Sequence, residues 1–184
     1  MTYAIICDKV KELQRKYDEH DPFRLCRAMG IHLVFRSLGT HEDCIKGFFI
    51  ERNRIRVITI NSDLPLVIQK IIAAHELGHA VLHRKEAHAF HDVAMFDSIS
   101  VCEKEANLFA AEYLMDDDEV LEALNRDGTF FNAASQLMVP AELLDFKFRM
   151  LKWKGYQMME SPIAVRSNFL RDLSIPVNTD YESC

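Results

Sequence analysis

Residues 75–79 read His-Glu-Leu-Gly-His, a run whose residue types and spacing are suited to holding a metal ion. Side chains four residues apart lie one above the other on a helix, so the imidazoles of His75 and His79 can reach one zinc ion while Glu76 projects beside it. A catalytic zinc takes three protein ligands and keeps one position for water. The run therefore predicts a hydrolytic metal site and requires one more ligand from elsewhere in the chain.

The identity of the third ligand decides the type of site. Metzincins place a third histidine six residues after the second, but that position holds Lys85. Glu103 stands at the start of the next expected helix with Asn107 one turn later, so Glu103 could bind zinc while Asn107 hydrogen-bonds a ligand. Glu105 lies about 160° around that helix and should face elsewhere. Glu103 is therefore preferred over the alternatives, which are Glu105, His88, His91 and Asp97.

Further polar side chains are expected around the metal. His83 continues the face of the two histidines, but helical drift of about 40° per four residues argues against a third imidazole ligand. We expect it to pack near the site or to orient a ligand. A hydrogen-bond donor should also stabilise the oxyanion of the reaction. The candidates for that donor are His88, His91 and Tyr113, and the sequence does not choose among them.

Two segments resemble the signature blocks of the ImmA/IrrE metallopeptidases. They are HELGHAVLH, from His75 to His83, and EKEANLFAAEYLM, from Glu103 to Met115. The resemblance covers roughly residues 20–150 and departs from the family at Asp116, where a proline is usual. It implies a gluzincin-like site in which His75, His79 and Glu103 are the zinc ligands. Glu76 is then the catalytic residue.

The resemblance also implies a regulatory role. Such a protease would cut, or otherwise inactivate, a separately encoded helix-turn-helix repressor and so relieve repression in a mobile element or a stress response. Zinc is the expected cofactor, with manganese as the alternative. Zinc lowers the pKa of a water molecule toward neutrality, and Glu76 would take its proton as general base. A substrate peptide could add as an extra strand to the edge of the sheet expected over residues 47–60.

Three classes of function stay open at this point. The first is a zinc endopeptidase that acts on a protein partner. The second is a non-catalytic, antitoxin-like module that keeps the metal and sequesters a regulator. The third is a purely structural zinc site, which Glu76 disfavours because structural sites fill all four positions with ligands and need no base.

The elements that must position these residues follow from changes of period along the chain. Helices are expected over residues 3–17, 22–30, 65–84, 101–115, 132–138 and 141–154. Strands are expected over residues 31–38, 45–51 and 55–60, the last two forming a hairpin. Residues 85–100 are expected to form a loop, and the acidic run 116–119 favours a helix start. We therefore expect an α+β fold, a mainly helical zincin-like domain with a small antiparallel sheet of about three strands beside the HExxH helix.

Length and composition limit the remaining choices. A chain of 184 residues with 49% hydrophobic content can bury one core. We expect a metallopeptidase domain over 1–160 and an extended or partly disordered tail over 161–184, which is polar and contains two prolines. A net charge of −6 without a basic block disfavours direct binding of nucleic acid or anionic membranes.

The expected location is the cytoplasm. No apolar run approaches the roughly 20 residues that cross a bilayer. The five cysteines are scattered and odd in number, which suits a reducing compartment.

Overall fold

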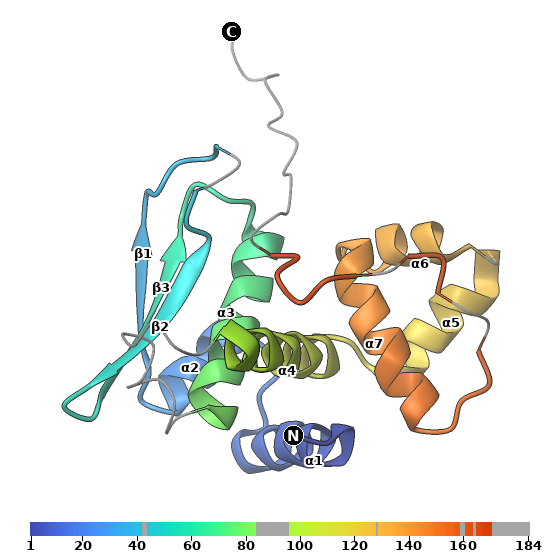
Figure 1. Cartoon of the computed structure of the whole chain (residues 1–184), viewed down its shortest axis with the longest axis horizontal. Helices are drawn as coiled ribbons and strands as arrows, with labels where there is room; N and C mark the ends of the chain where they lie inside the picture. The colour runs from blue at the N-terminus through green and yellow to red at the C-terminus, as the bar shows by residue number, and fades with distance from the viewer. Residues whose placement is uncertain (42–43, 84–95, 128, 159–160, 164, 171–184) are drawn as a thin grey trace, which may run out of the picture.

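The computed structural model describes residues 1–41, 44–83, 96–127, 129–158, 161–163 and 165–170. Its helices are α1 (Tyr3–Tyr17), α2 (Pro22–Ala28), α3 (Leu66–Leu82), α4 (Phe96–Leu114), α5 (Asp117–Asp127), α6 (Phe130–Gln136) and α7 (Ala141–Trp153). Its strands are β1 (His32–Arg36), β2 (Gly47–Arg52) and β3 (Ile55–Asn61). The described chain is mainly helical with one small sheet, which confirms the expected α+β class (Figure 1).

The sheet is mixed, and the expectation of a purely antiparallel sheet is wrong for one pair of strands. β2 and β3 form the expected antiparallel hairpin, whose turn residues Asn53 and Arg54 both have positive φ, as a two-residue type I′ turn requires. β1 instead pairs parallel with β3, in the order β1-β3-β2. β1 and β2 are the two edge strands of the described sheet, and the chain crosses from one edge to the other between them. The hairpin then places β3 in the middle of the sheet, where it runs antiparallel to β2 and parallel to β1.

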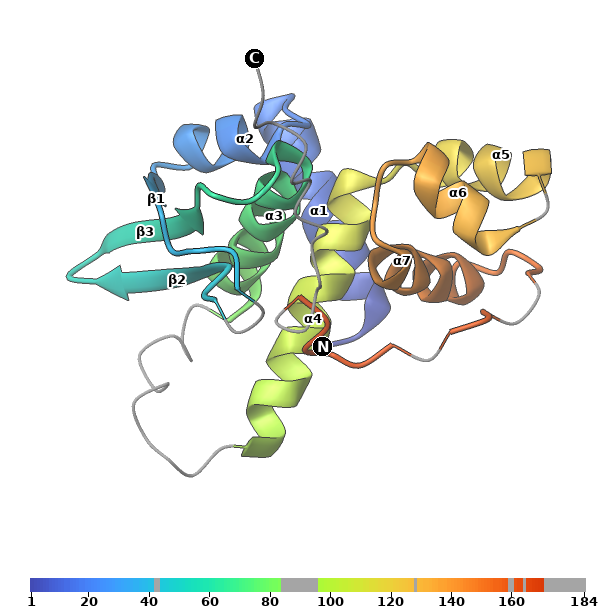
Figure 2. The same ribbon diagram turned by 90° about the horizontal axis from the view of Figure 1, so that it is seen from above.

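α3 occupies the centre of the molecule, between the sheet on one side and α4 on the other (Figures 1 and 2). The sheet buries Ile58 and Ile60, α3 buries Ile72 and Leu77, and α4 buries Phe109 within one apolar core. Burial of these side chains is the main force that holds the three layers together. The helix that carries the histidines is therefore fixed from both sides.

The two central helices approach each other closely at Gly78. A methyl group at position 78 would lie 3.1 Å from the Cα atom of Ala106 and 3.2 Å from its carbonyl oxygen. These are backbone atoms, which cannot rotate away as a side chain can. Glycine at this position therefore permits the spacing that brings the start of α4 to the histidines of α3.

We expect Gly78→Ala to destabilise the protein. Alanine improves helix propensity by about 1 kcal/mol, but overpacking against a backbone costs typically 1–3 kcal/mol, so the steric cost should win. Zinc affinity should fall as well, because the residues of α4 would move away from α3. Urea denaturation and a zinc titration check both effects, and a variant more stable than wild type with unchanged zinc affinity would contradict this account.

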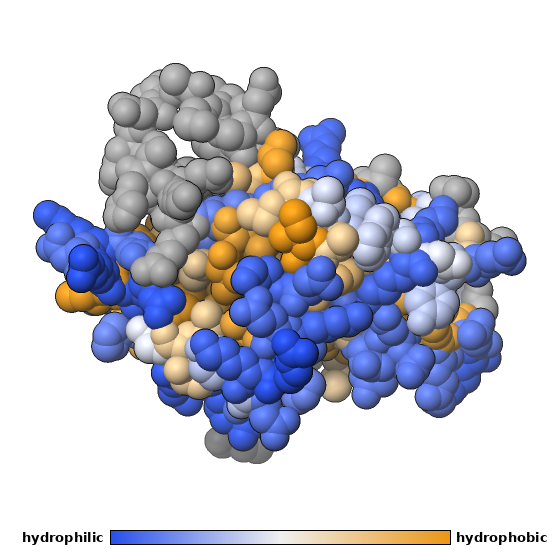
Figure 3. Space-filling view, turned by 90° about the horizontal axis from the view of Figure 1, so that it is seen from below, coloured by the Kyte–Doolittle hydropathy of each residue, from blue (hydrophilic) through white to orange (hydrophobic). Residues whose placement is uncertain are grey.

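The remaining helices cover the core from outside. α1 buries Ile6, Val10 and Leu13 and turns its polar side outward, and the face on which it lies is mostly hydrophilic with apolar residues gathered near the centre (Figure 3). α7 packs against α4 and fills the core from its own buried side. α7 is therefore a packing helix of the core.

One helix start differs from the sequence-based expectation by more than two residues, and another helix start is confirmed. α4 begins at Phe96 rather than Val101, because the weak helix propensity of the serines in its first turns obscured the start. The acidic run does begin a helix, since the Asp116 carboxylate accepts hydrogen bonds from the main-chain N–H groups of Asp118 and Glu119. No described helix is both long and apolar enough to cross a membrane.

The chain stays packed beyond residue 160, where we expected the domain to end. Phe169 is only 5% exposed, and its ring lies 5.6 Å from that of Phe146 in α7. The guanidinium of Arg149 donates to the carbonyl of Val165. Residues 165–170 are therefore part of the domain rather than of a tail, while residues 171–184 lie outside the described part of the chain.

Candidate metal centre

α3 brings three chemically active side chains together near its end. His75, Glu76 and His79 are 5%, 8% and 9% exposed, so all three face the interior. The Nε2 atoms of the two imidazoles lie 3.1 Å apart. Two nitrogen lone pairs this close favour a shared cation between them.

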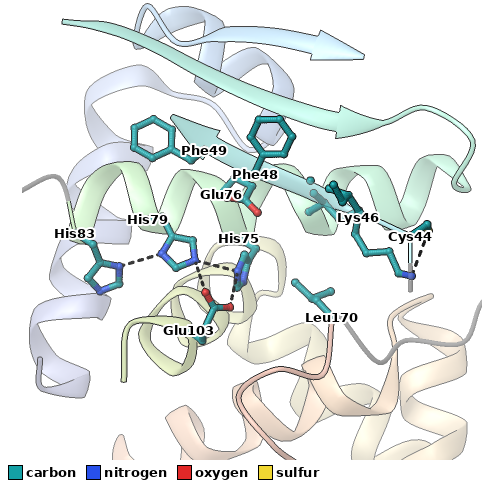
Figure 4. Close-up of a pocket in the computed structure, with 13 residues that line it drawn as sticks. Cys44, Lys46, Phe48, Phe49, His75, Glu76, His79, His83, Glu103 and Leu170 are labelled. Carbon is teal, nitrogen blue, oxygen red and sulfur yellow. Dashed lines mark hydrogen bonds and ion pairs between the residues drawn. The ribbon is translucent and has the colours of Figure 1, made fainter. Parts of the chain in front are cut away.

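Glu103 completes this group from α4, as the sequence predicts. One of its carboxylate oxygens lies 3.3 Å from Nε2 of His75, and the other lies 3.3 Å from Nε2 of His79 (Figure 4). Ligand atoms at the corners of a tetrahedron, about 2.0–2.1 Å from zinc, lie roughly 3.3 Å from each other. The three side chains therefore have the chemical types and the mutual spacing of a zinc tripod, and they stand out as a metal-binding group among the described residues.

The charge on Glu103 suits this role. Burial alone would raise the pKa of its carboxyl group, but hydrogen bonds with His75 and His79 hold that pKa well below its usual value. The alternative ligand Glu105 points elsewhere. His88 and His91 lie outside the described residues, and the side chain of Asp97 is likewise not described.

Glu76 lies beside the tripod on the cavity side and is held by the sheet. Burial raises the pKa of its carboxyl group to about 7, and the nearby charge of Glu103 adds to this, whereas His79 and a hydrogen bond from the main-chain N–H of Phe49 oppose it. This value belongs to the metal-free protein; a bound cation would lower the pKa and leave the carboxylate ready to accept a proton from water at physiological pH. This is the behaviour expected of a general base.

The raised pKa of Glu76 predicts how the stability of the metal-free protein depends on pH. In the unfolded chain Glu76 has its ordinary pKa near 4.5, and in the folded protein the pKa is about 7. The folded state therefore binds the proton more tightly, and its stability falls as pH rises from 4.5 to 7. Glu76→Gln removes this cost, so the metal-free variant should gain up to about 3 kcal/mol above pH 7 and nothing below pH 4.5. Urea denaturation in the presence of a chelator at pH 4 and pH 8 tests this, and an equal difference at both values would contradict it.

His75 is oriented by Asn107, the residue that the sequence placed one turn after Glu103. The Nδ1 atom of His75 lies 2.8 Å from Oδ1 of Asn107, which is fully buried. The Asn107 amide nitrogen in turn donates to the main-chain carbonyl of Ser167 at 2.5 Å. Asn107 therefore links a candidate ligand to the end of the described chain, a contact that sequence reasoning missed.

His79 is oriented by a second chain of contacts. Its Nδ1 atom lies 3.2 Å from Nδ1 of His83, and Nε2 of His83 lies 2.8 Å from a carboxylate oxygen of Glu105. The amino group of Met1 forms an ion pair with the other oxygen of Glu105. His83 thus takes the orienting place that its spacing predicts. The part played by Glu105 was missed, because no spacing rule connects α4 to the last turn of α3.

Tyr113 does not belong to this site. Its hydroxyl group donates to the main-chain carbonyl of Glu19 at 3.0 Å, and its side chain does not line the cavity over the tripod. Because Tyr113 lies about 15 Å further along α4 than Glu103 at 1.5 Å per residue, its choice as an oxyanion donor is wrong.

A cavity of about 510 Å³ opens over the candidate metal centre. The tripod and Glu76 form its floor, and β2 forms one wall (Figure 4). The other described side chains along it are largely apolar or cationic and include Ile45, Lys46, Phe48, Ile72 and Leu170. The space is sufficient for an extended segment of another molecule to reach the metal position.

β2 is the edge strand on this side of the described sheet, and it lies unusually close to α3. A methyl group on Gly47 would come 2.4 Å from Cγ2 of Ile72, so only glycine allows this approach. The carbonyl of Lys46 pairs with the N–H of Asn61 on β3. Since main-chain groups alternate in direction along an antiparallel strand, those of Gly47 and Phe49 point to the open edge.

An HExxH helix that faces a glutamate from the next helix is the arrangement of zinc metallopeptidases. The family model of the IrrE N-terminal-like domain, peptidase family M78, matches residues 26–149. The chain is also similar to uncharacterized immunity region protein 2 of Bacillus phage phi105. The two are 34% identical over 145 residues, which span 79% of this chain and 90% of the phage protein. The chain therefore belongs to the IrrE N-terminal-like peptidase family, in agreement with the resemblance of its signature segments.

Proposed function

We propose that this protein is a zinc-dependent endopeptidase that hydrolyses a peptide bond in a protein partner. The observation that carries the proposal is the convergence of His75, His79 and Glu103 beside the buried carboxyl group of Glu76, at the floor of an open cavity. Membership of a peptidase family supports it. Zinc is the expected ion, with manganese as the alternative.

The residues of the chain have distinct tasks in this reaction. When bound, the metal ion supplies Lewis acidity to the attacking water and to the substrate carbonyl. Glu76 accepts a proton from the water and delivers it to the leaving amine. The hydrogen bond from the N–H of Phe49 holds the Glu76 carboxylate toward the cavity. Asn107 and His83 keep the imidazoles of the tripod in place from behind.

The substrate strand would run along β2. The open edge presents the main-chain groups of Gly47 and the carbonyl of Phe49 next to Glu76, so an extended peptide that pairs with this edge would pass over the tripod. A crystal structure of the Glu76→Gln protein with a bound peptide tests this placement. A peptide that makes no main-chain hydrogen bonds to β2 would remove it.

The partner we propose is a separately encoded helix-turn-helix repressor. The relative from phage phi105 bears the name of an immunity region protein, which fits a repressor-related role. The cysteines are scattered along the sequence and odd in number, which suits a reducing cytoplasm, the compartment in which we expect such a repressor. Binding of nucleic acid by this chain itself is not part of the proposal, given its net charge of −6.

The proposal is tested with a helix-turn-helix repressor from the same genome, chosen first from the neighbouring genes. We expect the purified protein with zinc to cut that repressor at one or a few bonds, visible as defined fragments by mass spectrometry, and a chelator to stop the cleavage. An intact repressor that loses its operator binding in a stable complex would favour the alternative, a non-catalytic module that sequesters a regulator.

A further inference from the structure

Residues 165–170, here called the C-terminal strap, pass beside the candidate metal centre, where Ser167 contacts Asn107 and Leu170 lines the cavity. The family model matches residues 26–149, so the strap lies outside the matched segment. Its main-chain carbonyl at Ser167 nevertheless contacts the fully buried Asn107, sixty residues earlier in the chain. A part of the chain outside the matched segment therefore reaches the group that orients His75.

This contact determines which way the Asn107 amide faces. A main-chain carbonyl can only accept a hydrogen bond, so the NH₂ group of Asn107 must face Ser167. The amide oxygen is then left to face Nδ1 of His75, 2.8 Å away. A hydrogen must consequently sit on Nδ1 of His75, which leaves Nε2, the nitrogen that faces Glu103, as the one that can give up its hydrogen and bind a metal ion.

The opposite amide orientation would give the wrong tautomer. An NH₂ group facing His75 would require the lone pair on Nδ1 and a hydrogen on Nε2, where a metal ion needs a free nitrogen. Without the strap, Asn107 could adopt either orientation. We propose that the C-terminal strap is a positioning element that selects the metal-binding tautomer of His75 through Asn107. The proposal rests on the metal site described above, but not on peptide cleavage.

Phe169 anchors the strap and is the residue to change. Its ring is 5% exposed and packs on Phe146 of α7, while it makes no contact with the tripod that the structure describes. Phe148, which lies on α7 two residues after Phe146, is a matched control. It is 6% exposed and packs on Phe130, in a different part of the core.

Zinc affinity measured by competition with a fluorescent chelator tests the proposal. Loss of an outer partner of a ligand typically weakens zinc binding 10- to 100-fold, so Phe169→Ala should weaken it by about 10-fold. Phe148→Ala should lower the melting temperature to a similar extent and leave zinc affinity unchanged. If the alanine variants do not fold, Phe169→Leu and Phe148→Leu provide the same comparison with a smaller expected effect.

Asn107→Asp makes the test specific to the amide. A carboxylate has two equivalent acceptor oxygens, so it accepts from Nδ1 of His75 in either orientation. In the Asn107→Asp background, Phe169→Ala should therefore cause no further loss of zinc affinity. Long-range ¹H–¹⁵N spectra of the metal-free protein should show a hydrogen held on Nδ1 of His75 in wild type, and a mixture of forms with and without that hydrogen in Phe169→Ala.

Three results would overturn the proposal. One is an equal effect of Phe169→Ala in both backgrounds, and another is an effect no larger than that of Phe148→Ala. The third is a wild-type protein that binds no zinc, which would overturn the metal site as well. Zinc binding that depends on the strap, in a protein that cuts no partner, would support the strap and refute only the proposed peptidase.

Discussion

Glu76→Gln lowers the rate of peptide cleavage by about 10²- to 10⁴-fold, the range that a general acid–base residue contributes, while zinc stays bound. Glutamine has the size of glutamate and can occupy the same buried site, but it cannot accept the proton of the attacking water. Glu76 is not a member of the tripod, so the metal affinity should be retained. Cleavage of the partner repressor followed over time, with zinc content measured by mass spectrometry, provides both quantities.

The control for this variant is a glutamate far from the cavity. Glu119 is exposed in the first turn of α5, and Glu119→Gln should cleave at the wild-type rate. If the Glu76→Gln protein inactivated the repressor as well as wild type does, hydrolysis would not be the function, and the sequestering module would be the better explanation.

Glu103→Gln should cost zinc affinity about 10²-fold or more. Zinc sites with four protein ligands bind with about 10–16 kcal/mol, or roughly 3 kcal/mol for each ligand, and 1.4 kcal/mol corresponds to a factor of ten. The amide of glutamine lacks the charge that both imidazoles contact at 3.3 Å. The chelator competition assay that measures the strap variants measures this loss directly.

Glu105→Gln, on the same helix, is the matched comparison. Glu105 touches the site only through His83, so its loss should weaken zinc binding by about 10-fold, at the lower end for an outer partner. The order of the two effects is the informative result. If Glu105→Gln lost its zinc while Glu103→Gln kept it, the third ligand would be Glu105, and the assignment of Glu103 would be wrong.

The parts of the site that lie on helices were predictable from spacing alone. His75, His79 and His83 follow one face of α3, and Glu103 and Asn107 share one face of α4, because the helical period of 3.6 residues fixes such relations locally. To bring the faces of α3 and α4 together, the sequence-based prediction assumed only that both helices are buried and pack against each other. The relative placement of these side chains within each helix was therefore predictable before any coordinates, and their roles as zinc ligands and orienting residues stay predictions.

What could not be predicted depends on contacts between distant parts of the chain. The partner of Asn107 is a main-chain carbonyl, which every residue carries, so Ser167 has no distinguishing signal in the sequence. The parallel pairing of β1 depends on where the connection after Arg36 crosses the sheet, and no local pattern records that path. Nothing in the HExxH pattern requires a glycine at position 78. Glycine is needed there because the backbone of Ala106 lies too close for a larger residue.

The most direct test of the central claim is the location and coordination of the metal itself. Zinc-edge anomalous diffraction from crystals of the zinc-loaded protein, with X-ray absorption spectroscopy of the same sample, provides both. We predict one zinc ion per chain, bound to Nε2 of His75, Nε2 of His79 and a carboxylate oxygen of Glu103 at about 2.0–2.2 Å, with one position left for solvent. A zinc ion elsewhere in the molecule, or one whose four positions are all filled by protein atoms, would contradict it.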